Sequence, residues 1–218
     1  MFFCLLFLSV ISTLPTTSYS LTCIECSGID EFDIGIPCTG IVKTCSSKEV
    51  CVSKHSVAII GGLQQPRAYG RTCGQRELCS VSVSASAPYG RIMMSFSCCD
   101  TDRCTPPRPE LPSISSEKNG VVCKTCQSKE NVPCDSTTYM DCVGEETKCF
   151  SQVTSSGSRG AAERGCATPS LCAIPHNEGS FGNLDFKVDT TCTDGGAGLH
   201  YRLHLLPITF ICLFKVMS

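Results

Sequence analysis

Two Cys-x-x-Cys pairs in this chain have a spacing that is common in metal-binding and redox sites. They are Cys23/Cys26 and Cys123/Cys126. Such pairs bind zinc as thiolates, or they exchange disulfides when they sit on a thioredoxin-like βαβ unit. The sequence has no βαβ pattern, and 20 cysteines in 218 residues are typical of a secreted chain whose thiols are oxidised. The pairs therefore predict structural disulfides, with no metal and no cofactor.

No catalytic constellation is recognisable either. The four histidines form no H-E-x-x-H pattern, and no G-x-S-x-G nucleophile elbow occurs. We therefore predict no catalytic residues and no enzyme. A net charge of -2 with 17% charged residues gives no basic field for nucleic acid. The acidic residues Asp30, Glu31 and Asp33 are either a solvated loop or a contact for a basic partner.

Apolar segments stand at both ends of the chain. Residues 1–20 start MFFCLLFLSVISTL and end in small residues, which predicts a cleaved signal peptide; the alternative is a membrane anchor, for which the run is short. Residues 195–218 run from small residues through a short spacer to an apolar tail. This order predicts a glycosylphosphatidylinositol (GPI) attachment signal with attachment at Gly195, and the alternative is a secreted protein with an apolar tail. Removal of both segments would take away Cys4 and Cys212.

The remaining cysteines form two groups that share spacings. Each group opens with Cys-x-x-Cys and later has a pair separated by five residues, followed by about 20 residues to the next cysteine. A segment rich in Pro and Ser lies between them and predicts a semi-rigid extended linker. Because both groups are even, every cysteine has a partner available within its own group. The expected organisation is a first domain over 21–105, a linker over 106–119 and a second domain over 120–194.

Between the cysteines, apolar residues alternate with polar ones, which predicts β-hairpins and no amphipathic helix. Val81, Val83 and Ala85 precede a turn at 87–90, and the alternation resumes after it. The run 49–60 ends at a Gly-Gly turn signal. The predicted class is all-β and disulfide-rich. Apolar hairpin tips are candidate binding sites, although they could instead pack on the second domain or a neighbouring hairpin. The candidates are Ile59, Ile60, Leu63, Tyr89, Met93 and Met94.

The start and end of the first cysteine group resemble the Ly-6/uPAR, or three-finger, family. The matching motifs are Leu21-Thr22-Cys23, the first Cys-x-x-Cys pair, and Cys98-Cys99-Asp100-Thr101-Asp102-Arg103-Cys104. The resemblance implies two tandem three-finger domains. It also implies a set of disulfides, which are Cys23–Cys51, Cys26–Cys38, Cys45–Cys73, Cys79–Cys98, Cys99–Cys104, Cys123–Cys149, Cys126–Cys134, Cys142–Cys166 and Cys172–Cys192.

Within that family, the layout resembles the gamma-type phospholipase A2 inhibitors. The matching segments are Asn119-Gly120-Val121-Val122-Cys123, the run from Cys142 to Cys149, and Lys187-Val188. This implies an extracellular, non-enzymatic binding protein that blocks a secreted phospholipase A2 by steric occlusion. The predicted anchor favours an alternative, a GPI-anchored receptor or adhesion module of the urokinase-receptor type at the plasma membrane.

Overall fold

The computed structural model of the chain describes residues 20–30, 38–129, 134–157, 159–174, 177–181 and 184–197. The predicted signal peptide lies outside this set except for Ser20, and the predicted attachment segment lies outside it except for residues 195–197. The residues of the sequence analysis that also lie outside it are Glu31, Asp33, His176, His200 and His204.

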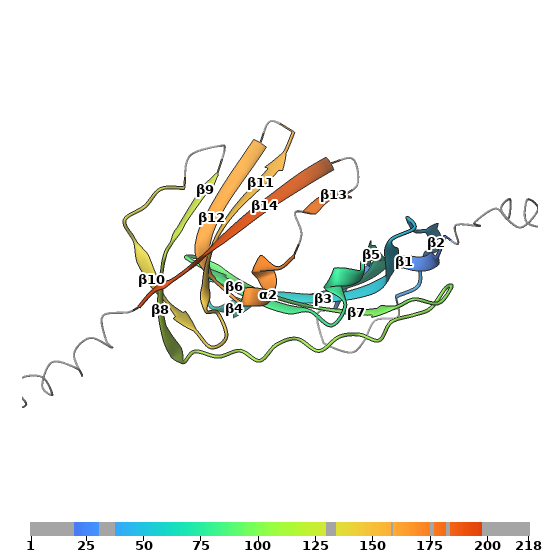
Figure 1. The fold of residues 1–218 in the computed structure, drawn as a ribbon, viewed down its shortest axis with the longest axis horizontal. Coiled ribbons are helices and arrows are strands. Elements are labelled where there is room, and N and C mark those ends of the chain that lie inside the picture. The colour runs from blue at the N-terminus through green and yellow to red at the C-terminus, as the bar shows by residue number, and fades with distance from the viewer. Residues whose placement is uncertain are drawn as a thin grey trace, which may run out of the picture.

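The N-terminal module is built from antiparallel strands joined by tight turns (Figure 1). Its elements are β1 (Thr22–Asp30), β2 (Ile41–Thr44), β3 (Glu49–Ile60), β4 (Leu63–Gln64), β5 (Arg67–Gln75), the 3-10 turn η1 (Arg76–Leu78), β6 (Ser82–Ala87) and β7 (Gly90–Cys99). The alternating segments form the predicted hairpin, in which Ala87 of β6 faces Gly90 of β7 across the turn. The run 49–60 is the single long strand β3.

The C-terminal module repeats the pattern of strands. Its elements are β8 (Lys118–Lys124), β9 (Cys126–Lys129), β10 (Tyr139–Val143), β11 (Lys148–Ser156), β12 (Arg159–Ala167), the short helix α2 (Pro169–Cys172), β13 (Asn177–Phe181), β14 (Leu184–Asp194) and β15 (Gly196–Ala197). No helix within the described part of the chain has the length and apolar character needed to cross a membrane. The predicted all-β, disulfide-rich class is confirmed.

A shared sheet connects the two modules. Its strand order is β13-β14-β11-β12-β6-β7-β3-β5-β1-β2, with β4 beside β3 and β9 beside β12, while β10, β8 and β15 form a second sheet. The junction is the pairing of β12 with β6, where Cys166 faces Ser86 and Ala167 faces Ala85. Gly165 permits this approach, because a Cβ atom there would lie 1.9 Å from the carbonyl oxygen of Ser86.

An apolar cluster of five residues spans the same junction. It contains Val83 and Ala85 from β6, Phe150 from β11, Ala167 from β12 and Leu171 from α2. Neither module could bury these side chains alone, so the hydrophobic effect stabilises the junction as well as each module. The arrangement in Figure 1 is therefore two modules that share packing, with the strands of the C-terminal module inclined to the N-terminal sheet.

Nine disulfides lie within the described part of the chain, five in the N-terminal module and four in the C-terminal module, and none of them joins the two modules. The pairs coincide with those that the family resemblance implies. They are Cys23–Cys51, Cys26–Cys38, Cys45–Cys73, Cys79–Cys98, Cys99–Cys104, Cys123–Cys149, Cys126–Cys134, Cys142–Cys166 and Cys172–Cys192. Modules of this size cannot build a generous core, and disulfides compensate by about 2–4 kcal/mol each.

Residues 106–117, which we call the strap, pack against the N-terminal sheet instead of forming an unattached linker between the modules. They return along the N-terminal sheet to β8 (Figure 1). The Ser53 hydroxyl donates to the Pro106 carbonyl at 2.9 Å, and the Ser97 hydroxyl donates to the Pro107 carbonyl. Prolines suit this role because they supply carbonyl acceptors without an N–H group that would itself need a partner. The strap thereby covers a sheet face that is rich in serine.

Candidate binding surface

The predicted apolar tips lie at one end of the N-terminal sheet, beside the C-terminal module. Ile60, Leu63 and Tyr89 expose 55%, 72% and 67% of their surface, and Ile59 is half-buried. The turn after Ile60 uses Gly61 and Gly62 at φ values of 59° and 81°, a backbone region that favours glycine. The turn holds the apolar side chains at the tip because the next strand, β4, pairs directly with β3.

Two of the predicted tip residues do not belong to this surface. Met93 is 1% exposed, which contradicts its proposed role as an exposed contact. Alternation along β7 points Met93 toward the face that the strap covers, where it joins the lining of a cavity with Leu111 and Ile114. Met94 points to the opposite face and packs against both apolar clusters as a half-buried residue. Both faces of β7 are covered, so its alternation did not separate buried from exposed positions.

An apolar groove of about 720 Å³ opens between the tips and the strap. One wall is formed by Ile59 and Ile60, another by Tyr89, and the strap contributes Ile114, which is 56% exposed. Val143 at the end of β10 brings the C-terminal module into the same lining. A groove of this composition can accept an apolar side chain of a partner, and exposed apolar patches commonly mark interaction sites.

Tyr89 stands as a ridge between this groove and a second hollow. The second hollow, about 540 Å³, is lined by Pro88 and Tyr89 on one side and by residues of β9 and the segment 134–138 on the other. Its lining is more polar and includes Gln127 and Asp135. An aromatic side chain with both flanks open is well suited to be a central contact in a protein interface.

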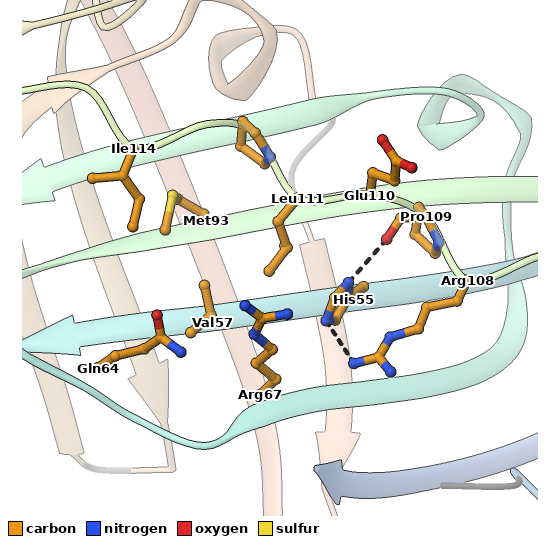
Figure 2. A pocket seen from close by; sticks show the side chains of 11 residues that line it. His55, Val57, Gln64, Arg67, Met93, Arg108, Pro109, Glu110, Leu111 and Ile114 are labelled. Carbon is orange, nitrogen blue, oxygen red and sulfur yellow. Dashed lines mark hydrogen bonds between the residues drawn. The ribbon is translucent and has the colours of Figure 1, made fainter. Parts of the chain in front are cut away.

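A third hollow lies farther along the strap, around His55 (Figure 2). The Nδ1 atom of His55 is 2.9 Å from the carbonyl oxygen of Pro109, and its Nε2 atom is 2.9 Å from the Arg108 guanidinium. A carbonyl can only accept and a guanidinium can only donate, so the tautomer that satisfies both contacts has its proton on Nδ1. His55 is 4% exposed and connects β3 to the strap, which is a structural role.

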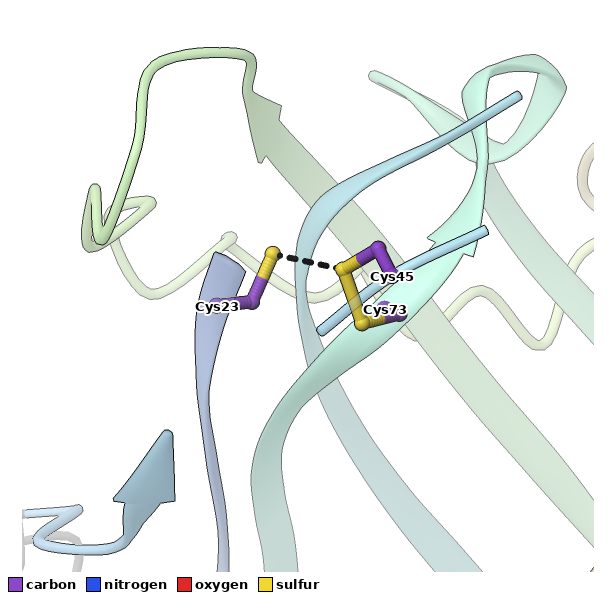
Figure 3. Close-up of side chains that lie close together, drawn as sticks. All are labelled: Cys23, Cys45 and Cys73. Carbon is purple, nitrogen blue, oxygen red and sulfur yellow. Dashed lines mark hydrogen bonds between the residues drawn. A yellow bond between two sulfur atoms is a disulfide. The ribbon is translucent and has the colours of Figure 1, made fainter. Parts of the chain in front are cut away.

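Two groups of three cysteines have sulfur atoms close enough to resemble metal sites. They are Cys23, Cys45 and Cys73 (Figure 3), and Cys123, Cys142 and Cys166. In the first group the Sγ atoms of Cys23 and Cys45 are 3.1 Å apart, and in the second those of Cys123 and Cys142 are 3.3 Å apart. Every one of these sulfurs is already in a disulfide, whereas a metal needs thiolates. The two groups are equivalent disulfide stacks of the two modules.

Sequence reasoning placed half of the groove and missed the other half. The tips were recognisable because apolar residues surround turn signals. Ile114 was not singled out, because it lies in a segment read as a linker, and Val143 was not, because nothing local reveals that β10 ends beside the first module. The predicted attachment residue, Gly195, lies between β14 and β15, against Val121 and Cys149.

Comparison with known proteins finds relatives over most of the chain, although no family model matches it. The chain is 27% identical over 198 residues to phospholipase A2 inhibitor NAI of Notechis ater, an alignment that covers 87% of this chain and 94% of that protein. It is 25% identical over 180 residues to the phospholipase A2 inhibitor 25 kDa subunit of Naja kaouthia, covering 79% and 94%.

A shorter similarity involves a receptor. The urokinase plasminogen activator surface receptor of Aotus trivirgatus is 28% identical over 118 residues, which are 50% of this chain and 35% of the receptor. Protein RoBo-1 of Rattus norvegicus is a further homologue. The inhibitors thus match nearly end to end, and the receptor matches in part.

Proposed function

Starting from the homology of this chain to two-domain proteins of the Ly-6/uPAR type, we propose that it binds and inhibits a secreted phospholipase A2 by steric occlusion. The observation that carries the proposal is the alignment with a phospholipase A2 inhibitor over 94% of the inhibitor's length. The relatives and the oxidised cysteines support an extracellular protein. Two domains over 21–105 and 120–194, joined by the segment 106–119, are part of the proposal.

Inhibition would proceed by contact alone. The groove and the Tyr89 ridge present apolar surface on hairpins that disulfides and strand pairing already hold in place, so little ordering entropy is lost on binding. A stable interface buries about 800 Å² on each partner, which exceeds one groove. The contact would therefore extend over Leu63 and the second hollow, and a protein of phospholipase size would have its own active-site entrance covered.

The direct test uses protein recovered from cells that express the full chain. Added to a panel of secreted phospholipases A2, it should stop hydrolysis of micellar substrate by at least one of them at saturation. Ile60→Ser and Tyr89→Ser should each weaken inhibition by about tenfold, the usual scale for a central interface residue. Ile41→Ser is the matched control, because Ile41 is 71% exposed but lies on β2 at the opposite end of the sheet. Unchanged hydrolysis across the panel would refute the proposal.

A second candidate is a GPI-anchored receptor or adhesion module. It is supported by the partial match to the urokinase receptor and by the attachment pattern at 195–218. Treatment of expressing cells with a phosphatidylinositol-specific lipase distinguishes the two. Release of the protein by the lipase supports the anchored form, and recovery of the protein in untreated medium supports the circulating inhibitor.

A further inference from the structure

Three separate segments frame the apolar groove, and its shape depends on how they are held together. The hairpin tips supply Ile60 and Tyr89, the strap supplies Ile114 and Ser115, and β10 supplies Val143. Ser86 and Arg91 also line the groove. Both belong to a polar cluster that includes Ser84 of the same module and Glu146 of the other module.

The centre of that cluster is Glu146, in the turn between β10 and β11. Its side chain is 2% exposed. Its Oε1 atom accepts hydrogen bonds from the hydroxyls of Ser84 and Ser86, the second at 2.9 Å, and lies 3.3 Å from Nε of Arg91. One carboxylate oxygen of the C-terminal module therefore accepts two hydrogen bonds from β6 and forms an ion pair with Arg91 at the start of β7, all on the N-terminal module.

Arg91 extends the cluster to the strap. Its Nη1 atom donates to the carbonyl of Ser115 at 2.9 Å, and its Nε atom donates to Ser86 Oγ at 2.8 Å. The turn that carries Glu146 is tied down independently, because the side-chain amide of Asn119 donates to the carbonyls of Gly144 and Glu146. A single connected network thus links β6 and β7, the strap and the β10–β11 turn.

The stability of such a network depends strongly on the relative positions of its members. The Glu146 carboxylate, whose side chain is 2% exposed, has lost most of its hydration, and two hydroxyl hydrogen bonds and the ion pair with Arg91 replace it. The second oxygen of Glu146, Oε2, is also buried and accepts no hydrogen bond from the described residues. Any displacement of one module against the other would leave this carboxylate and the Arg91 guanidinium without their compensating partners. The apolar cluster at the junction holds the two modules together, but hydrophobic attraction has no preferred direction. The polar network fixes the position of one module relative to the other.

We propose that Glu146 is a positioning residue, which sets the placement of the two modules and the strap and so preforms the apolar groove for a rigid partner surface that presents a large apolar side chain. The inference rests on the proposed binding function, since it assigns the groove as the site. It also explains a motif singled out in the sequence, because Glu146 lies in the Cys142 to Cys149 segment. Its neighbour Glu145 is exposed.

The decisive comparison is Glu146→Gln against Glu145→Gln in the full chain. In the first variant the new amide oxygen could still accept from the two serines, but the half-buried Arg91 would be left without this counter-charge. Hydrogen exchange, read by mass spectrometry, should accelerate about tenfold in peptides that cover β6, the strap and β12, because opening of the junction exposes them. Peptides from β1 and β5 should not change, and Glu145→Gln should match the wild type throughout.

A rescue experiment separates positioning from loss of packing. Arg91→Gln combined with Glu146→Gln removes both charges of the pair, so exchange should return to within about threefold of the wild type. A variant that merely disturbed packing would become worse with the second substitution. Ser86→Ala, which removes one donor and no charge, gives a milder variant should Glu146→Gln fail to fold, and it should accelerate exchange in the same peptides.

Inhibition of a secreted phospholipase A2 by the same proteins completes the test. Loss of inhibition by about tenfold in Glu146→Gln and its partial return in the double variant support the inference. Exchange equal to that of the Glu145→Gln control, or unchanged inhibition despite faster exchange, overturns it. If exchange responds as expected while the wild type inhibits none of the enzymes, the proposed function fails and the part of the inference that concerns the junction stands.

Discussion

The two modules close their first strand in different ways. In the N-terminal module, the Cys99–Cys104 disulfide bends the chain back to β1, where the Arg103 amide donates to the Thr22 carbonyl at 2.8 Å. The Thr22 amide in turn donates to Asp102 at 2.9 Å. In the C-terminal module, β15 pairs with β8 instead, so that Gly196 faces Val122.

Thr22 and Val122 occupy the same place, one residue before the first cysteine of each group. A short covalent loop and a two-residue strand therefore complete the same edge. The difference follows from where the chain goes next. The first module must turn the chain into the strap, which needs a pinned loop, whereas in the second module residues 196–197 continue beside β8 as β15. The missing fifth disulfide of the second group is thus replaced by backbone pairing.

Among the changes considered, removal of the Cys99–Cys104 disulfide should lower the free energy of unfolding the most. Cys99→Ser with Cys104→Ser frees a short loop, for which the chain-entropy relation gives a loss of about 2 kcal/mol in the free energy of unfolding. Denaturant unfolding would measure it, with exchange of β8 peptides as the internal control. A loss shared equally by both modules would mean that they unfold as one unit and would remove the distinction.

Removal of the strand closure should cost less. A chain that ends at Asp194 loses the β15–β8 pairing that a chain ending at Ala197 keeps, and we expect a loss of about 1 kcal/mol from its backbone hydrogen bonds. Denaturant midpoints of the two chains measure the difference. Equal midpoints would show that β15 does not close the module. Lipid attachment at Gly195 would remove the same strand, so the result also bears on the predicted attachment residue.

The N-terminal closure should be sensitive to acid. Hydrogen bonds from the hydroxyl and amide of Thr22 hold the pKa of Asp102 below its ordinary 3.8. A carboxyl whose pKa is lowered by folding contributes stability above the unfolded-state value and loses it as the pH falls through the folded-state value. Thermal midpoints of the wild type should therefore approach those of Asp102→Asn below pH 3.8. A constant difference between the two proteins from pH 7 to pH 2 would contradict this.

In the C-terminal module, Glu163 should make stability depend on pH in the opposite direction, and this effect should be the smallest of the four. Burial raises the pKa of Glu163 on β12 above its ordinary 4.5. The folded state then binds the proton more tightly than the unfolded state, so stability falls as the pH rises through this range. Glu163→Gln should melt slightly higher than the wild type at pH 7 and at the same temperature near pH 4. Gln127→Ala, which removes only the partner of Glu163, is the control; a lower melting temperature for Glu163→Gln at pH 7 would be inconsistent with this sign.

Local patterns predicted the parts of the fold that local forces decide. The alternation around Val83 and the turn before Gly90 appear as the β6–β7 hairpin, and the Gly-Gly signal ends β3 as expected. The interpretation of Met93 was wrong because alternation assumes one covered face, and here the strap covers the other.

Contacts between distant segments account for what the sequence did not reveal. Glu146 accepts hydrogen bonds from serines about 60 residues earlier in the chain, and the strap carbonyl of Pro106 accepts one from Ser53 of β3, which is 53 residues earlier. The sequence around a serine in a strand does not indicate whether its hydroxyl will donate a hydrogen bond to water or to a carbonyl. The groove could therefore be predicted only as far as its turns, and its other walls come from tertiary packing.

The way the strap is bound determines which sequence changes it can tolerate. The N-terminal sheet binds it largely through main-chain carbonyls, which every residue possesses. Substitutions along it should therefore be tolerated more readily than the insertion of a single residue, which would move each later carbonyl away from its donor. We expect descendants of this protein to vary in the residue types of the strap while keeping its length.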